Sequence, residues 1–446
     1  MPGRNSLASV LNRRIVICAF TGFTSGLPLF FLLQLVPAWL RDQQVGLKEI
    51  GAFSLVGLPY TWKFLWSPLL DRYRLPWLGR RRGWMLATQV VLLVLLALLG
   101  VFRPKSDFEL IVVISGIVAF FSATQDIVVD AYRRELLPDA ELGLGNAVHI
   151  QTYKLAGLIP GSLGLVLAPP HLQWPTVFAI VASFMLVGIG LTLAVAEVAP
   201  QRGPETLRAA IVEPFREYFS RRGLRAGVLV LLFMFLYKLG DSMATALATP
   251  FYLDIGFSKT QIGLIAKNAA LWPSIVAGIV GGVVMIRIGI NRALWWFGAV
   301  QLLVIFGFAV LARAGDDPWL LAGVIALESV GVSLGTSAFV AFIARETAPA
   351  LAATQFALFT AVTALPRTFA SALTGLIVEG DAGGVGGSFA ARLLALLHTL
   401  GLPAGGLGWQ RFFLLCIAAG LPGMLLLWWV APYGSRSGAP AEARER

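Results

Sequence analysis

The chain has 446 residues, of which 57% are hydrophobic and only 13% are charged, about half the charged share of an ordinary soluble domain. So few charges cannot cover the water-facing surface of a chain this long, which excludes a soluble globular protein. The formal charge of +11 does not indicate a nucleic-acid partner. If Met1 is cytosolic, the lysines and arginines gather in the cytosolic connections between apolar segments, which is the positive-inside pattern of a membrane protein.

Apolar segments of about 20 residues or more recur along the chain, and each is long enough to cross a hydrocarbon core of about 30 Å. They predict an all-α integral membrane protein with twelve transmembrane helices and both termini in the cytosol. In chain order we expect helices near residues 15–40, 48–70, 84–102, 109–131, 144–168, 174–195, 225–253, 259–286, 293–314, 318–343, 351–378 and 409–431.

Two connections are long, and they define the predicted organisation. A polar, basic linker at 197–224 separates an N-terminal bundle of six helices, 1–196, from a C-terminal bundle of six, 225–446. A glycine-rich connection near 379–408 lies on the outer side. The apolar stretch inside it is too short to span the membrane. Two pairs of landmarks repeat at offsets of 212 and 211 residues, Ile50-Gly51 with Ile262-Gly263 and Arg134-Glu135 with Arg345-Glu346. Internal repeats of this kind are typical of secondary transporters.

The connection after the second helix contains Asp71-Arg72, then Gly79 and three consecutive arginines, Arg80, Arg81 and Arg82. This order resembles the signature of the major facilitator superfamily. An aspartate at a helix end can pair with arginines and hold one side of a transporter closed, so we expect Asp71 and these arginines to form a gate. A plain basic anchor is the alternative, but it gives no reason for the aspartate.

Longer strings resemble the muropeptide permease (AmpG-type) family within that superfamily, and they occur in both halves: Phe64–Tyr73, Gly79–Trp84, Ser122–Ala131, Tyr237–Asp241, Gly335–Ala341 and Ala353–Leu358. The resemblance implies the major facilitator fold, with two pseudo-symmetric six-helix bundles. It also implies a monomeric proton symporter of the bacterial inner membrane that imports anhydromuropeptides for peptidoglycan recycling. No cofactor is expected beyond the proton gradient. A permease for another anionic metabolite, such as an acyl-CoA or a siderophore, is the alternative.

Ionisable residues lie inside the predicted helices, where each charge costs about 2.5–3.5 kcal/mol on insertion scales. They must therefore face one another or a water-filled cavity. These residues are Lys63, Asp126, Asp130, Lys154, Lys238, Asp241, Lys267, Glu328 and Arg367.

A carboxyl group in a poorly solvated cavity can take up a proton on one side of the membrane and release it on the other. We expect this proton-coupling role for Asp241, Glu328 and Asp126, in that order. Lys238 and Asp241 are three residues apart and could form an ion pair, whose role could also be helix packing alone. Asp130 is expected at the cytosolic edge, where it would join Arg134 and the arginines 80–82 in the gate.

The cations and several aromatic residues are candidates for substrate binding. Lys63, Lys154, Lys267, Lys238 and above all Arg367 would bind the peptide carboxylates of a muropeptide, unless they only neutralise the acidic residues. Aromatic faces would stack on sugar rings, although interfacial anchoring explains many membrane aromatics equally well. The aromatic candidates are Tyr60, Trp62, Tyr153, Tyr237 and Trp272.

Nothing in the sequence predicts an enzyme or a metal site. The chain has three histidines and two cysteines, and His149 has no second histidine nearby to share a metal. No Ser-His, Cys-His or metal-spaced arrangement is recognisable. The expected partners are a small anionic sugar-peptide and the lipid bilayer.

Overall fold

The computed structural model describes residues 12–45, 53–76, 78–169, 171–198, 206–379 and 407–434. These residues form helices and their connections, and within them no strand occurs beyond an isolated bridge between Leu75 and Gly79. Among them, eight helices or helix runs are long and apolar enough to cross a membrane. The glycine-rich connection predicted near 379–408 lies almost wholly outside the described residues.

The chain forms two compact units. Unit 1 contains Met1–Arg221 together with Val340–Ala361, and unit 2 contains Arg222–Phe339 together with Val362–Arg446. The boundary between Arg221 and Arg222 falls inside the predicted linker at 197–224. The units are defined by compactness, so the count of six helices in each bundle stays a prediction. Each unit is described by itself.

Unit 1 begins with a long helical run made of α2 (Arg13–Phe30), a π-helical turn η1 (Phe31–Leu35) and α3 (Val36–Asp42). This run packs along α9 (Leu142–Ala156), which continues through the π-helical η4 (Ile159–Leu163) into α10 (Gly164–Leu167). The packing is close because glycine lines it: a Cβ at Gly22 or Gly26 would collide with the backbone carbonyl of His149 or Tyr153. Small residues let membrane helices approach in this way.

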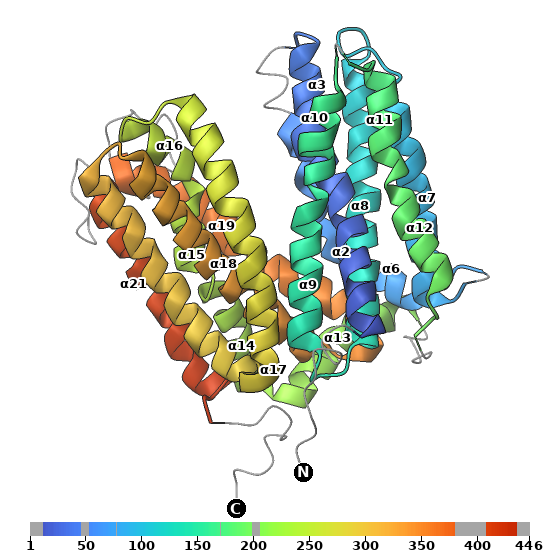
Figure 1. The fold of residues 1–446 in the computed structure, drawn as a ribbon. Coiled ribbons are helices and arrows are strands. Elements are labelled where there is room, and N and C mark those ends of the chain that lie inside the picture. The colour runs from blue at the N-terminus through green and yellow to red at the C-terminus, as the bar shows by residue number, and fades with distance from the viewer. Residues whose placement is uncertain are drawn as a thin grey trace, which may run out of the picture. The chain divides into compact units, whose positions relative to one another are not determined.

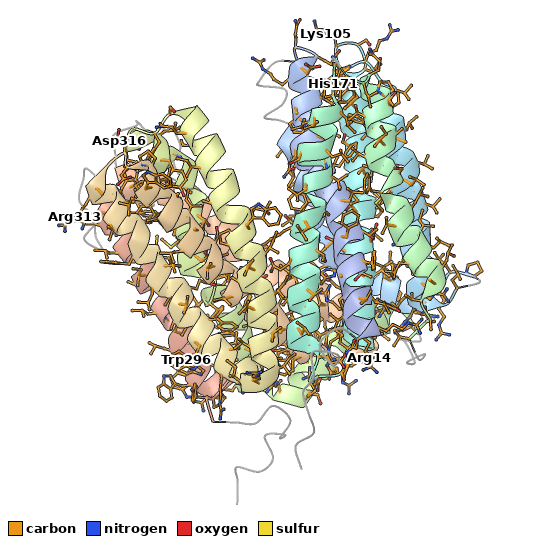
Figure 2. The ribbon with its side chains drawn as sticks, viewed as in Figure 1. Arg14, Lys105, His171, Trp296, Arg313 and Asp316 are labelled. Carbon is orange, nitrogen blue, oxygen red and sulfur yellow. The ribbon has the colours of Figure 1, made fainter. Side chains whose placement is uncertain are left out.

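The remaining long helices of unit 1 are α7 (Arg80–Leu99), α8 (Phe108–Leu136), α11 (Trp174–Ser183) and α12 (Met185–Ala194). Figure 1 shows them running side by side, and Figure 2 shows that Arg14 lies at one end of the unit while Lys105 and His171 lie at the other. Arg14 stands at the start of α2, and Lys105 and His171 stand in the connections after the third and the fifth predicted spans. The alternation of direction expected from the sequence is therefore present within this unit.

The predicted helix at 48–70 is interrupted. Its described part consists of η2 (Ser54–Gly57), α5 (Leu58–Trp62), η3 (Lys63–Leu65) and α6 (Ser67–Arg72). Pro59 and Pro68 stand in the first turns of α5 and α6, where proline is tolerated because its missing N–H would lack an intrahelical partner anyway. The breaks place Lys63 in a tight turn instead of a regular helix.

Unit 1 also includes helix α13 (Leu207–Arg222), which lies inside the predicted linker, and the short turn η5 (Pro349–Leu351) before α19 (Ala352–Glu379). Gln355 of α19 donates from Nε2 to the carbonyl oxygen of Pro214 at 2.9 Å. The rings of Tyr218 and Phe359 meet edge to face at 5.2 Å. The linker helix is therefore packed against the start of α19.

Unit 2 contains α14 (Leu224–Leu236), α15 (Leu239–Ala246), α16 (Ala248–Asp254), α17 (Lys259–Ala314) and α21 (Gly408–Val430). It also contains α18 (Pro318–Glu346) up to Phe339 and α19 from Val362 onward. The continuous α17 covers two predicted helices, and Gly289, with φ of 79°, interrupts it between them. That backbone conformation favours glycine. Phe251, Phe308 and Phe413 meet in the core of the unit. In Figure 2, Trp296 lies at one end of unit 2 and Arg313 and Asp316 at the other.

Candidate functional site

A shared lysine joins the two aspartates of α8. Lys63 Nζ of η3 lies 4.0 Å from Asp126 Oδ2 and 3.9 Å from Asp130 Oδ2. Ser25 Oγ of α2 donates a hydrogen bond to Asp126 Oδ1. Arg133, one turn beyond Asp130, pairs with its Oδ1 at 2.7 Å. Two carboxylates four residues apart on one helix face are thus served by cations from two elements.

Ser25, Asp126, Asp130 and Arg133 border a cavity of about 400 Å³. All of its lining residues belong to unit 1, and most of its charged or polar groups come from α8 and α9. Lys154 and Tyr153 of α9 line it, as the sequence predicted for residues inside this helix. The other lining residues are Phe30, His149, Ile150, Val340, Phe356 and Thr360. A cavity that carries both charge signs and aromatic rings can bind a polar solute while offering a carboxylate to a proton.

The position of Asp130 differs from the expectation. It lines the cavity with Arg133, lies 3.9 Å from Lys63 and, among the described residues, does not pair with the arginines 80–82. Arg134 also points elsewhere: its Nε donates to the carbonyl oxygen of Thr347 at 3.0 Å, and its Nη2 lies 3.4 Å from Asp139. Arg134 stands one turn closer to the end of α8 at Leu136, where it reaches the residues that precede α19, whereas Asp130 stays beside Lys63 and Arg133.

The arginine-rich loop forms a separate buried cluster. Arg81 Nη2 lies 2.8 Å from Asp71 Oδ1 and 2.7 Å from Glu135 Oε1, and Arg80 lies 2.8 Å from the same glutamate oxygen. The side chains of Arg81 and Asp71 are 0% exposed. Charges buried so completely need both an ion partner and hydrogen bonds, and Arg81 Nη1 donates to the carbonyl oxygen of Leu70 at 3.1 Å.

Asp71 also caps the start of α19. Its Oδ2 accepts from the backbone N–H of Thr354 at 2.8 Å and from Thr354 Oγ1 at 2.7 Å, and its Oδ1 accepts from Ala353 N–H at 3.3 Å. The first N–H groups of a helix lack intrahelical acceptors, and a negative charge there also meets the positive end of the helix dipole. One carboxylate therefore joins the end of α6, the start of α7 and the start of α19.

Two acidic residues of this cluster were missed as site residues. Glu135 was noticed only as a repeat landmark, and Glu197 accepts from the backbone N–H groups of Arg81 at 2.8 Å and Arg82 at 3.0 Å. Arg82 donates from its guanidinium to the carbonyl oxygens of Thr192 and Leu193. Arg72 lies apart, with its guanidinium over the ring of Tyr73. A basic loop signals the arginines, but only packing reveals their acceptors.

Unit 2 carries its own lysine–carboxylate pair. The helix is interrupted between α14 and α15, and Lys238 at this break pairs with Asp241 at 2.8 Å. Lys238 Nζ also donates to Gln301 Oε1 at 3.1 Å and to Thr336 Oγ1 at 3.2 Å. The pair suggested by the spacing of three is therefore present, with two neutral acceptors that the sequence did not indicate. Glu328 lies in α18, with its Oε2 3.5 Å from Ser329 Oγ.

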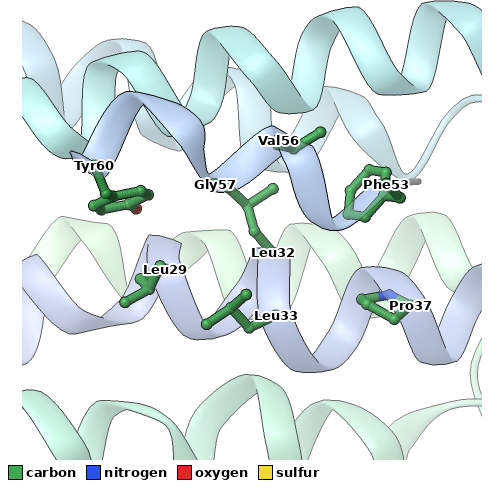
Figure 3. A pocket seen from close by; sticks show the side chains of 8 residues that line it. All are labelled: Leu29, Leu32, Leu33, Pro37, Phe53, Val56, Gly57 and Tyr60. Carbon is green, nitrogen blue, oxygen red and sulfur yellow. The ribbon is translucent and has the colours of Figure 1, made fainter. Parts of the chain in front are cut away.

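The predicted aromatic residues have different surroundings. Tyr60 donates to Ser122 Oγ at 2.7 Å, and it borders a small apolar cavity of about 120 Å³ between η1 and α5, shown in Figure 3. Tyr237 is buried, with its hydroxyl on the carbonyl oxygen of Leu294 and its ring stacked on Phe339. Trp62 and Trp272 are half exposed. Of the five predicted aromatic residues, Tyr153 is the one that lines the 400 Å³ cavity within the described part of the chain.

Two predicted substrate-binding residues fall outside what the structure describes. Lys267 lies in α17 and Arg367 in α19, but their side chains are not among the described ones. Their roles therefore stay predictions.

Comparisons with known proteins address the family directly. The model of the Major Facilitator Superfamily matches residues 18–371. The anhydromuropeptide permease of Escherichia coli is 36% identical over 416 residues, which are 93% of this chain and 79% of that protein. An uncharacterised protein of Haemophilus influenzae is 47% identical over 96% of this chain and 97% of its own length.

Solved structures show the same fold at low sequence identity. The human organic anion transporter TETRAN superposes with a TM-score of 0.66 at 17% identity, covering 93% of this chain and 99% of its own. The transporter FucP, in an outward conformation, gives 0.66 at 13% identity over 94% and 99%. The fold and the relatives are those of transporters and not of enzymes. The chain thus belongs to the Major Facilitator Superfamily and, within it, to the muropeptide permease (AmpG-type) family, as its motifs predicted.

Proposed function

We propose that this transporter imports anhydromuropeptides across the bacterial inner membrane and that the proton gradient drives the uptake. The observation that carries this proposal is the 36% identity to the Escherichia coli anhydromuropeptide permease, which extends over 93% of the chain. The likeness extends over nearly the whole chain and is therefore not confined to one of the two units. An anhydromuropeptide combines sugar rings with peptide carboxylates, and both need complementary groups.

The cavity of unit 1 offers such groups. Lys154 and Arg133 are cations suited to carboxylates, and Tyr153 provides an aromatic ring beside them. Bidentate arginine–carboxylate contacts are stronger and more specific than those of a single ammonium. In the proposal these residues bind the peptide portion, while Arg367 and Lys267 remain further candidates.

Proton coupling is assigned to the aspartates that share Lys63. Protonation of Asp126 or Asp130 removes one negative charge from a site with a cation about 4 Å from both. Lys63 is then held by the other aspartate alone. When Lys63 changes its aspartate partner in this way, the position of η3 depends on which aspartate is protonated. Both aspartates line the cavity, so protonation also changes the charge that the cavity presents.

Alternating access and topology complete the proposal. The cluster of Asp71, Arg81 and Glu135 with the start of α19 would hold the cytosolic side closed and open as the cavity turns inward. The N-terminus would lie in the cytosol, because Arg14 pairs with Glu141 just after α8 and Arg81 pairs with Glu135 at the end of α8. With twelve spans, the C-terminus would lie on the same side. That side carries the arginine excess of the positive-inside rule.

Uptake by purified protein in liposomes tests the function. With an inward proton gradient, radiolabelled anhydromuropeptide should accumulate, and a protonophore should abolish the accumulation. Liposomes without protein give the background. If the label enters no faster than this background while an acyl-CoA or a siderophore accumulates, the substrate assignment is wrong.

A further inference from the structure

The linker helix α13 exposes an apolar surface that no described residue covers. Leu207, Ile211 and Phe215 follow one another at intervals of four and are 42%, 49% and 45% exposed. Intervals of four place side chains on one helix face. In a helix outside the spans, such a row would face water unless something covers it.

The row of side chains next to this apolar row indicates what kind of partner binds here. Arg208, Val212 and Arg216 are also spaced by four and are all exposed. Thus an apolar row lies beside a row with two guanidinium groups. Helices of this kind lie in the interface of a bilayer, with apolar side chains among the acyl chains and arginines at the headgroups.

The face of α13 next to the apolar row is packed on unit 1, so the helix cannot rotate these rows away. Ala210, Pro214 and Tyr218 form the buried row. Arg221 donates to the carbonyl oxygen of Glu346 at 2.7 Å. Figure 1 shows α13 at the end of unit 1 where α2 begins, the end that carries the arginine cluster of α7.

We propose that α13 is a binding surface for anionic phospholipid of the membrane leaflet at this end. Leu207, Ile211 and Phe215 would enter the acyl-chain region, and Arg208 and Arg216 would bind the headgroup phosphates. Each arginine near an anionic leaflet strengthens binding to that leaflet about fivefold. The choice of lipid over a second protein follows from the arginines, because an interface between identical copies would bring these like charges together.

Fluorescence quenching by brominated lipid tests this surface in the full-length protein. Cys18 and Cys416 are both buried and are first replaced by alanine. A bimane label is then attached through Ile211→Cys, or through Glu213→Cys as a matched control on an exposed position of the opposite side. The vesicles contain phosphatidylcholine with the same fraction of either brominated phosphatidylglycerol or brominated phosphatidylcholine.

The label at position 211 should be quenched, and at least about threefold more by the brominated phosphatidylglycerol. The label at 213 should be little affected by either lipid. Combining Arg208→Gln with Arg216→Gln should remove the preference while the protein still unfolds at the same temperature.

Equal quenching at 211 and 213 would overturn the proposal, as would a preference that survives the loss of both arginines. If neither lipid quenches the label at 211 and labelled copies cross-link to each other, the proposal is wrong and the surface binds a second copy of the chain.

Discussion

The two units each hold a lysine among carboxylates, but they hold it differently. In unit 2, Lys238 lies 2.8 Å from one aspartate and donates to two neutral oxygens, from Gln301 and Thr336. An ammonium has three donors, so this lysine is saturated. In unit 1, Lys63 lies about 4 Å from two aspartates and within hydrogen-bond distance of neither.

The difference separates a structural pair from a responsive one. A saturated cation has a single low-energy position, because moving it would leave buried acceptors unsatisfied. A cation shared at equal distance between two carboxylates has two low-energy positions, one beside each carboxylate. Protonation of either carboxylate selects the position beside the other. The comparison therefore favours Asp126 and Asp130 as the proton-coupling residues over Asp241, which sequence reasoning placed first.

The largest expected effect follows from removing the proton acceptor. Asp126→Asn should abolish proton-driven accumulation, while exchange of labelled for unlabelled substrate at equal pH continues. Each coupled proton supplies about 2.3 kcal/mol per 100 mV, equivalent to about a 50-fold accumulation ratio. Asp241→Asn is the matched variant in unit 2 and should keep accumulation at a reduced rate. Normal accumulation by Asp126→Asn, with loss in Asp241→Asn, would reverse the assignment.

The loops after the second helix of each half extend the comparison. Asp71 stands in the unit 1 loop, whereas the corresponding stretch of unit 2, from Gly281 to Arg292, contains no aspartate. Asp71→Asn should lower stability by about 3–5 kcal/mol, because it leaves Arg81 buried with one ion partner fewer. Thermal unfolding in detergent measures the shift.

Arg72→Gln is the control for this position, since Arg72 lies beside Asp71 in sequence but over the ring of Tyr73. It should change stability by less than about 0.5 kcal/mol. Equal unfolding temperatures for the two variants would show that the buried cluster does not hold α19 in place.

Stability also distinguishes the two lysines. Lys238→Met should cost about 3 kcal/mol, because Asp241 loses its close cation and two further acceptors lose their donor. Lys63→Met should cost about 1 kcal/mol, because Asp130 keeps Arg133, Asp126 keeps Ser25, and both border the cavity. The unfolding midpoints of the two variants in detergent test the order. A lower midpoint for Lys63→Met would contradict the view that unit 2 holds the structural pair.

Sequence reasoning found the spans because hydrophobic length is a local property. The described part of each expected segment is helical, although the segments 259–286 and 293–314 both lie in α17. The family followed from local strings. The internal breaks were less accessible: Pro59 and Pro68 indicated them, but the tight turn at Lys63 depends on how η3 packs on α8. Helix α13 was missed because a basic linker with prolines looks irregular until Tyr218 and Pro214 find their partners on α19.

The site was predictable where the partners are close in sequence. A spacing of three predicts that Lys238 and Asp241 can meet, and a spacing of four places Asp126 beside Asp130. Lys63 lies more than 60 residues from both. The acceptors of Arg81 come from α6, from α8 and from Glu197 beyond α12. Such partners depend on helix packing, which a single sequence does not fix. For the same reason the sequence ranked Asp241 above Asp126, since burial alone does not tell a saturated pair from a shared one.

The smallest expected effect tests the saturation of Lys238 itself. Gly335 of α18 faces Gln301, and a Cβ there would collide with the Oε1 atom that Lys238 binds. Gly335→Ala should therefore displace Gln301 and cost about 1–2 kcal/mol. A Cβ at Gly323 of the same helix would meet nothing within 4 Å, so Gly323→Ala should stabilise by up to about 1 kcal/mol. Thermal unfolding in detergent gives both shifts. If Gly335→Ala unfolds at the temperature of Gly323→Ala, the glutamine is dispensable to Lys238, and the contrast between a saturated and a shared lysine would rest on the aspartate distances alone.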